Sequence, residues 1–408
     1  MSIVEKGSVT SPKGFKASGI KAGLKRSGAP DMAMIYSEAP CVAAGAFTSN
    51  LFEAAPVVFD RERIAAGDAI HAVVINSGNA NACTGEQGLA DARATAEKAA
   101  ALLGCPANAV MVSSTGRIGV PMPMDIILNG TELAAKALSE DGGENAALAI
   151  MTTDTRPKSF SVKIEIDGVA VTLGGMTKGA GMIAPKLRMA PPQATMLSYV
   201  TTDAAIDKAA LQAALAEALD KSYNRITVDG DTSTNDTFVV LANGQAGNKT
   251  IMPGTAESEL FAEALASLAG RLAKEMVKDG EGVSRFVEVN VTGAKSDADA
   301  RVCAEAIANS ALCKTAWFGA DPNWGRILCA AGYCGFSFDP SKVNLDMQGA
   351  PVVRGGMDAG TPESELVKLV SDKEVKIDLD LGAGTGSFTV WTCDLTYDYV
   401  KINADYHT

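Results

Sequence analysis

Short apolar runs, several of them alternating with polar residues, recur through the first half of the chain and predict β-strands. They cover residues 32–36, 42–48, 56–59, 72–76 and 109–113. Two further runs, 162–166 and 169–173, flank the dipeptide Asp167-Gly168, which is typical of a two-residue hairpin turn. A broad sheet is therefore expected in this part of the chain.

Apolar residues at helical spacing occur between and after these runs. Residues 86–103 form such a pattern and stop at Gly104, Asp207 is suited to cap a helix over 208–219, and a long helix is expected over 256–277. Near the end, residues 388–403 alternate again and predict a strand that continues toward Thr408. The mixture is compatible with an α/β fold class, although periodicity alone does not select one architecture.

Composition narrows the class of protein. The chain has 408 residues, enough for two or three domains, and 47% hydrophobic and 21% charged residues are ordinary for a globular protein. A formal net charge of -12 argues against binding to nucleic acid or anionic membranes, because both require basic surfaces. The first residues lack the apolar core of a secretion signal, and no run of about 18 apolar residues occurs. A cytoplasmic protein is therefore expected.

Cysteine and histidine usage limits the chemistry further. Eight cysteines lie among small apolar residues without C-x-x-C spacing, which favours buried thiols over a disulfide framework. Only two histidines occur, His71 and His407, so a zinc site or a Ser-His-Asp triad would have very few imidazoles available. No metal is expected. A nucleophile that is activated by its own α-amino group needs no histidine.

The segment 176–203 contains the best candidate for such a nucleophile, Thr195. Glycines and prolines precede it, and the apolar, β-branched run 196–201 that follows predicts a buried strand. A hydroxyl group at the mouth of a buried strand has rigid support. From the pattern alone, a loop that enters a core strand remains the more common explanation.

Cleavage of the bond between Ala194 and Thr195 would give Thr195 both a nucleophilic hydroxyl and its own general base. It would create a free α-amine, a group with a pKa near 8. Around neutral pH a useful fraction of that amine is unprotonated and can accept the hydroxyl proton. In the uncut chain the same nitrogen is an amide, so cleavage would create the base together with the chain end.

Other positions carry candidate chemistry with common structural alternatives. Thr115 and Gly116 follow a predicted strand, where one hydroxyl and one backbone N–H can point at a developing oxyanion, although Thr-Gly is also a frequent turn. Lys178 lies in a glycine-rich turn and can hold a carboxylate or be merely solvated. Glu281, between two glycines, suits a substrate ammonium group or a surface turn. The basic segment 13–25 is explained at least as well by a solvated loop.

Several motifs together resemble one family, the arginine-biosynthesis bifunctional ornithine acetyltransferases/N-acetylglutamate synthases. They are N-S-G-N-A-N-A at 76–82, S-T-G-R-I-G at 114–119, K-G-A-G-M-I-A-P at 178–185, A-T-M-L at 194–197 and V-D-G-D-T-S-T-N-D at 228–236. The resemblance extends from Pro12 to Thr408. One departure is that residues 186–193 make the segment before Ala194 roughly six residues longer than is usual in the family.

The resemblance implies a fold and a processing event. The expected fold is an α/β (α+β) one, a DmpA/ornithine-acetyltransferase-like α-β-β-α sandwich with a second, smaller α/β domain. Self-cleavage between Ala194 and Thr195 would give an alpha subunit, residues 1–194, and a beta subunit, residues 195–408. Two of each are expected to form a heterotetramer.

The resemblance also implies an activity and its residues. Thr195 would take the acetyl group from N-acetylornithine and pass it to glutamate, with Thr115 and Gly116 as the oxyanion hole. No cofactor is implied, and the sequence leaves open whether acetyl-CoA also serves as acetyl donor. The expected substrate contacts are Thr152, with Thr153 as the near alternative, Lys178, Thr195, Glu281, Asn403 and Thr408.

Two rival functions remain at this stage. An amidase or aminopeptidase with an amino-terminal nucleophile would share the fold and the machinery but admit water to the acyl-enzyme. A small-molecule-binding protein would have lost processing through the longer segment before Ala194. The first rival releases acetate without glutamate, and the second remains one polypeptide.

Overall fold

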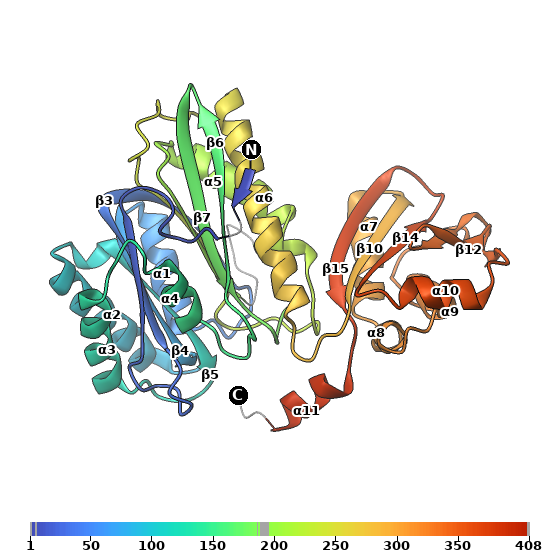
Figure 1. Ribbon diagram of the computed structural model, residues 1–408, viewed down its shortest axis with the longest axis horizontal. Coiled ribbons are helices and arrows are strands. Elements are labelled where there is room, and N and C mark those ends of the chain that lie inside the picture. The colour runs from blue at the N-terminus through green and yellow to red at the C-terminus, as the bar shows by residue number, and fades with distance from the viewer. Residues whose placement is uncertain (1, 5, 186, 188–195, 406–408) are drawn as a thin grey trace. The chain divides into compact units, whose positions relative to one another are not determined.

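The computed structural model describes residues 2–4, 6–185, 187 and 196–405. The chain divides into two compact units (Figure 1). The larger unit contains the chain up to Asn224 and Asp231–Met276, and the smaller contains Arg225–Gly230 and the chain from Val277 onward. These units do not coincide with the two expected cleavage products, since a cut before Thr195 falls inside the larger unit.

The larger unit is built on a sheet of nine strands among the described residues. Its order is β1-β6-β7-β8-β9-β3-β4-β5, and β2 pairs with β3 outside this path. The strands are β1 (Ser2–Val4), β2 (Phe15–Ile20), β3 (Met32–Phe47), β4 (Ile70–Asn79), β5 (Val110–Arg117), β6 (Lys158–Ile166), β7 (Val169–Lys178), β8 (Leu197–Thr202) and β9 (Thr237–Ala242).

Strand β3 belongs to both halves of this sheet. Its first part, from Met32 to Tyr36, pairs with β4, and its second part, from Val42 to Phe47, pairs with β9. The two strands expected over 32–36 and 42–48 are therefore one. The halves share an apolar core in which Ile35 of β3 is buried together with Leu197 and Tyr199 of β8.

Helices cover the outer faces of the two halves. They are α1 (Ala55–Ala66), α2 (Gly85–Leu103), α3 (Met124–Lys136), α4 (Gly143–Ala149), α5 (Lys208–Asp220) and α6 (Ala256–Lys278), with short 3-10 turns at Ala107–Ala109 and Tyr223–Arg225. Helices α2 and α3 bury Ala96 and Ile127 against Met34 of β3. On the other half, Leu268 and Leu272 of α6 lie over Gly175 of β7. The predicted α-β-β-α sandwich is thus confirmed.

The smaller unit has a six-stranded sheet of its own, with the order β13-β12-β11-β14-β10-β15. Val289 of the central strand β10 and Ile377 of β14 are both fully buried in its core. The second, smaller α/β domain is therefore confirmed. The elements are β10 (Phe286–Ala294), α7 (Asp297–Ala308), α8 (Ala311–Phe318), α9 (Trp324–Gly332), a 3-10 turn (Pro340–Lys342), β11 (Asn344–Met347), β12 (Ala350–Arg354), β13 (Met357–Asp358), α10 (Glu363–Val370), β14 (Glu374–Asp380), β15 (Gly386–Cys393) and α11 (Tyr397–Asp405).

One predicted strand is wrong, and another is confirmed only in its first part. Residues 56–59 form the first turn of α1, where Pro56 is well tolerated because its missing N–H has no partner in a first turn. The strand expected over 388–403 ends at Cys393, and α11 begins at Tyr397. Thr396 starts this helix, since its hydroxyl accepts a hydrogen bond of 3.2 Å from the backbone N–H of Tyr399.

All eight cysteines are described and none forms a disulfide. Five are buried as expected, whereas Cys83 and Cys329 are exposed and Cys105 is half-buried. Across the described ranges, no helix is long and apolar enough to cross a membrane.

Candidate functional site

The predicted oxyanion hole lies at the carboxyl end of β5. This strand runs parallel to β4, and the register pairs Ser77 with Thr115 and Gly78 with Gly116. Gly116 has a φ of +132°, and a Cβ there would collide with the Gly78 backbone. Only glycine fits such a position, so the sharp turn after Thr115 depends on the residue predicted to complete the hole.

Lys178, at the end of β7, reaches the same place. The strand lies inside the sheet, with β6 on one side and β8 on the other, so the side chain is only 6% exposed. Its Nζ lies 3.4 Å from the Thr115 hydroxyl oxygen. The structure therefore brings together Lys178 and Thr115, which are 63 residues apart in the chain.

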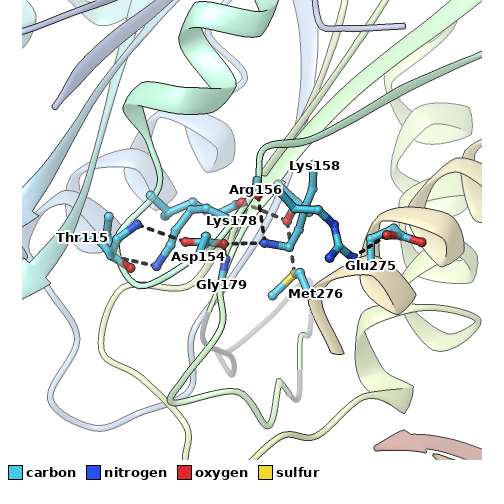
Figure 2. Close-up of polar contacts among 11 residues, drawn as sticks. Thr115, Asp154, Arg156, Lys158, Lys178, Gly179, Glu275 and Met276 are labelled. Carbon is cyan, nitrogen blue, oxygen red and sulfur yellow. Dashed lines mark hydrogen bonds and ion pairs between the residues drawn. The ribbon is translucent and has the colours of Figure 1, made fainter. Parts of the chain in front are cut away.

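A buried carboxylate, Asp154, organises the backbone around this lysine. Its Oδ1 accepts hydrogen bonds of 2.7 Å from the Gly179 N–H and from Lys158 Nζ, and its Oδ2 accepts one of 3.0 Å from the Thr152 N–H. Figure 2 shows Asp154 between Lys158 and Lys178. One side chain thus connects the predicted substrate contact Thr152 to the turn that follows Lys178.

The charges of Lys158 and Lys178 determine whether the Asp154 carboxyl is ionised. Burial alone favours a neutral Asp154, but the Lys158 and Lys178 ammonium groups and the two hydrogen bonds to Oδ1 outweigh it and lower the pKa to about 2. Asp154 is therefore ionised at neutral pH. Two ammonium groups and one carboxylate leave these three side chains with a net positive charge, which favours an anionic substrate group or a developing oxyanion nearby.

The outer edge of the cluster is tied to α6. Arg156 forms an ion pair of 2.9 Å with Glu275, and the Arg156 side chain is 47% exposed (Figure 2). A half-exposed pair of this kind contributes little to stability. The buried Asp154–Lys158 pair, with side chains 0% and 1% exposed, is the structural centre of the loop.

Two other predicted substrate contacts meet in the smaller unit. Glu281 is 8% exposed, and its Oε2 accepts a hydrogen bond of 2.7 Å from the Asn403 side-chain amide. Asn403 lies on α11, and the Tyr399 hydroxyl of the same helix bonds to Asp229 Oδ2 at 3.2 Å. Glu281 is thus bonded directly to α11.

The predicted nucleophile Thr195, the preceding Ala194 and the predicted substrate contact Thr408 lie outside the described residues. The strand predicted directly after Thr195 is confirmed, because β8 is buried along its full length. The Met196 carbonyl accepts a hydrogen bond of 2.7 Å from the Thr237 N–H, so the chain is bonded to β9 from the residue that precedes β8.

Sequence reasoning identified Thr115, Gly116 and Lys178 but missed Asp154 and Lys158. Both missed residues belong to the polar stretch T-T-D-T-R-P-K, which reads as a solvated loop. The only local signal is the spacing of four between carboxylate and ammonium. The roles predicted for these residues and for Thr152, Glu281 and Asn403 stay predictions.

Comparison with known proteins settles the family. The model of the ArgJ family matches residues 16–408. The chain belongs to the ArgJ family. The family predicted from the motifs is confirmed, and membership of ArgJ makes the chain an acetyltransferase of arginine biosynthesis.

Individual ArgJ relatives match over nearly their full length. The arginine biosynthesis bifunctional protein ArgJ of Symbiobacterium thermophilum is 52% identical over 404 residues, which cover 98% of this chain and 99% of the relative. A crystal structure of the Bacillus halodurans ArgJ protein is 45% identical with a TM-score of 0.50, over 52% of this chain and 100% of that chain. The ornithine acetyltransferase of Mycobacterium tuberculosis, solved with ornithine, is 43% identical with a TM-score of 0.43, over 46% of this chain and 99% of that chain.

Proposed function

We propose that this ArgJ protein moves the acetyl group of N-acetylornithine to glutamate through an acetyl ester on Thr195. The match to ArgJ over residues 16–408 carries the proposal. The Lys178–Thr115 contact and the net positive charge around Asp154 support it, because acyl transfer builds negative charge on the carbonyl oxygen.

The first step is cleavage between Ala194 and Thr195. It frees the Thr195 amine, which then accepts the hydroxyl proton as the oxygen attacks the acetyl carbonyl. The solved Bacillus halodurans chain supports processing, since it is matched over its whole length by 52% of this chain. Residues 195–408 make up the same share, 214 of 408 residues.

The oxyanion of each tetrahedral intermediate is held by the Thr115 hydroxyl and the Gly116 N–H, with Lys178 close to the hydroxyl. Collapse of the first intermediate expels ornithine and leaves the acetyl ester. The glutamate amine then attacks this ester, and Thr195 leaves with its proton restored. Loss of one oxyanion donor is expected to lower kcat by roughly 100- to 1,000-fold.

The remaining features are the residues that bind the substrate and the assembly of the two pieces. Glu281 and Asn403 bind the charged end of the amino acid, with the carboxylate facing an ammonium group and the amide fixing its orientation. The subunits 1–194 and 195–408 assemble as two alpha and two beta pieces, and the enzyme works in the cytoplasm. Thr152 contacts the substrate, while Thr153 is equally half-buried and remains the alternative.

One set of measurements tests this function. Intact mass of the purified wild-type protein should give two pieces, one ending at Ala194 and the other beginning at Thr195. Thr195→Ala should remain one folded polypeptide without acetyl transfer, and Thr195→Ser should still be cut, more slowly. Normal transfer by the Ala variant, or full activity of an uncut chain, would disprove the mechanism.

The assay for transfer also separates it from hydrolysis. N-acetylornithine is supplied with and without glutamate, and both acetate and N-acetylglutamate are measured. A transferase forms N-acetylglutamate and little acetate. An amidase of the same fold releases acetate at the same rate in both reactions.

A second activity is favoured by the word bifunctional in the names of the relatives. We propose that acetyl-CoA can replace N-acetylornithine as the donor to Thr195. Incubation with acetyl-CoA and glutamate alone should then yield N-acetylglutamate and free thiol. Absence of both products in an enzyme that transfers from N-acetylornithine would limit the protein to one activity.

A further inference from the structure

The basic, glycine-rich segment near the amino terminus is not a freely solvated loop. Asp31, fully buried at the start of β3, binds four consecutive backbone N–H groups between β2 and β3. The donors are Ala22 at 2.6 Å, Gly23 at 3.1 Å, Leu24 at 2.6 Å and Lys25 at 3.0 Å. A carboxylate with several backbone donors holds such a loop in one conformation.

This loop lies against the predicted oxyanion turn. The Ser77 N–H donates to the Asp31 carbonyl at 2.9 Å, which joins the loop to the end of β4. At Gly78, the partner of Gly116 in the sheet, a Cβ would lie 3.5 Å from Leu24 Cβ and 3.6 Å from Lys25 Cγ. The stem of Lys25 therefore runs beside the backbone that positions Gly116.

The ammonium group of Lys25 reaches the other side of the site. Its Nζ donates 2.7 Å hydrogen bonds to the carbonyls of Pro30 and Met151, with a longer contact of 3.5 Å to that of Ala149. The Met151 carbonyl and the Thr152 N–H belong to the same peptide group. Lys25 binds one end of that group and Asp154 binds the other, so the two side chains fix its plane.

Lys25 also contributes to the charge of the site. Burial lowers its pKa to about 8; Asp31 and Asp154 oppose this effect, and the like charge of Lys178 adds to it. An anion that binds near both Lys25 and Lys178 offsets the repulsion between their ammonium groups and is therefore favoured.

We propose that Lys25 is a positioning residue of the substrate site, which orients the Met151–Thr152 peptide and, with Lys178, favours binding of the substrate carboxylate. The inference rests on the proposed function, because N-acetylornithine and glutamate both carry an α-carboxylate. Both half-reactions should therefore depend on Lys25. A purely structural lysine would affect stability without affecting KM selectively.

The test compares the full-length wild-type enzyme with Lys25→Met, Lys25→Arg and the control Lys21→Met, an exposed lysine of the same loop. KM and kcat for both substrates are measured between pH 6.5 and 9.5, together with thermal unfolding. Lys25→Met should raise both KM values about tenfold at pH 7 and change kcat less than threefold, because it removes one positive charge near the substrate carboxylate and the charge-assisted hydrogen bond that orients the Met151–Thr152 peptide. Lys21→Met should match the wild type.

The pH profile separates positioning by charge from simple packing. Lys25 loses its proton as the pH rises through about 8, so the wild-type KM should increase above that pH. The arginine of Lys25→Arg keeps its charge at high pH, so this variant should bind both substrates well and its KM should not rise above pH 8. This comparison tests the inference even if Lys25→Met fails to fold. The reacting amines are the same in every variant, so a difference between the KM–pH profiles of wild type and Lys25→Arg is assigned to residue 25.

Two results would overturn the inference: wild-type KM values in Lys25→Met, or an unchanged rise of KM above pH 8 in Lys25→Arg. A wild-type enzyme that transfers no acetyl group from N-acetylornithine would instead refute the proposed function. The two failures are therefore distinguishable.

Discussion

Replacement of Asp154 by asparagine tests whether the buried carboxylate organises the site. The variant keeps the shape of the side chain and removes the charge. An asparagine oxygen can accept from only part of the present donor set, which comprises the Thr152 N–H, the Gly179 N–H and Lys158 Nζ. Its NH2 group would face one of these donors instead, and Lys158, 1% exposed, would lose its counter-charge.

The expected loss of stability in Asp154→Asn is estimated in two ways. The pKa of Asp154 falls from 3.8 to about 2 in the folded protein, which corresponds to about 2 kcal/mol of stability at neutral pH. Removing one partner of a buried ion pair typically costs roughly 3–5 kcal/mol, because the remaining charge stays buried. We expect the Asp154→Asn variant to be about 3 kcal/mol less stable at pH 7.

Urea unfolding followed by circular dichroism measures this loss. Glu275→Gln is the matched control, since it breaks the pairs with Arg156 at 2.9 Å and with Arg271 at 3.5 Å, whose arginines are 47% and 38% exposed, and should cost about 1 kcal/mol or less. Because the folded-state pKa of Asp154 is depressed, its contribution is present above pH 4 and is lost as the pH falls through 2. The difference in the free energy of unfolding between wild type and Asp154→Asn should therefore become smaller at acidic pH. Equal losses in Asp154→Asn and Glu275→Gln at pH 7 would refute this reasoning.

Three further variants probe other parts of the molecule. Gly116→Ala places a Cβ at a φ of +132° against the Gly78 backbone, so kcat for acetyl transfer should fall at least about 100-fold in a steady-state assay. Asn403→Ala removes the hydrogen bond to Glu281 at an exposed position; KM for N-acetylornithine should rise several-fold while the melting temperature stays within about 2 °C. Asp207→Ala deletes the cap of α5, whose carboxylate accepts from the Ala209 and Ala210 N–H groups, and denaturant unfolding should show a loss of about 1 kcal/mol without a change in KM.

Predictions from local sequence signals are correct where neighbouring residues alone determine the structure. The Asp167-Gly168 turn has φ values of +51° and +77°, the conformation that this dipeptide favours, and it joins β6 to β7 as predicted. Asp207 caps α5 as predicted. Gly104 ends α2 in the left-handed conformation.

Predictions failed where contacts between residues far apart in the chain determine the local structure. The alternating pattern after Cys393 predicts more strand, but the Asp394 carboxylate binds the backbone N–H groups of Ser284 and Arg285, more than 100 residues away. The Leu395 N–H binds the Lys314 carbonyl. These contacts turn the chain into α11, and no local pattern encodes them.

The same limit applies to the site. Lys178 follows a predicted hairpin and lies inside a recognisable motif, although the sequence predicts a glycine-rich turn there and the structure extends β7 to this residue. Asp154 and Lys158 look like exposed loop residues, because sequence alone does not reveal that tertiary packing excludes water from both. The role of Asp154 in organising this loop is visible only from its hydrogen bonds to Thr152, Lys158 and Gly179.

The order of strands in the larger sheet has a consequence for the proposed cleavage products. Strands β8 and β9 belong to the beta piece, yet they lie between β7 and β3 of the alpha piece, joined by six register pairs on each side. Separating the pieces would open two hydrogen-bonded ladders in the middle of the sheet and expose unpaired edges. The cut protein should therefore behave as a single particle in dilution, and recovery from denaturant should become a bimolecular reaction, faster at higher protein concentration.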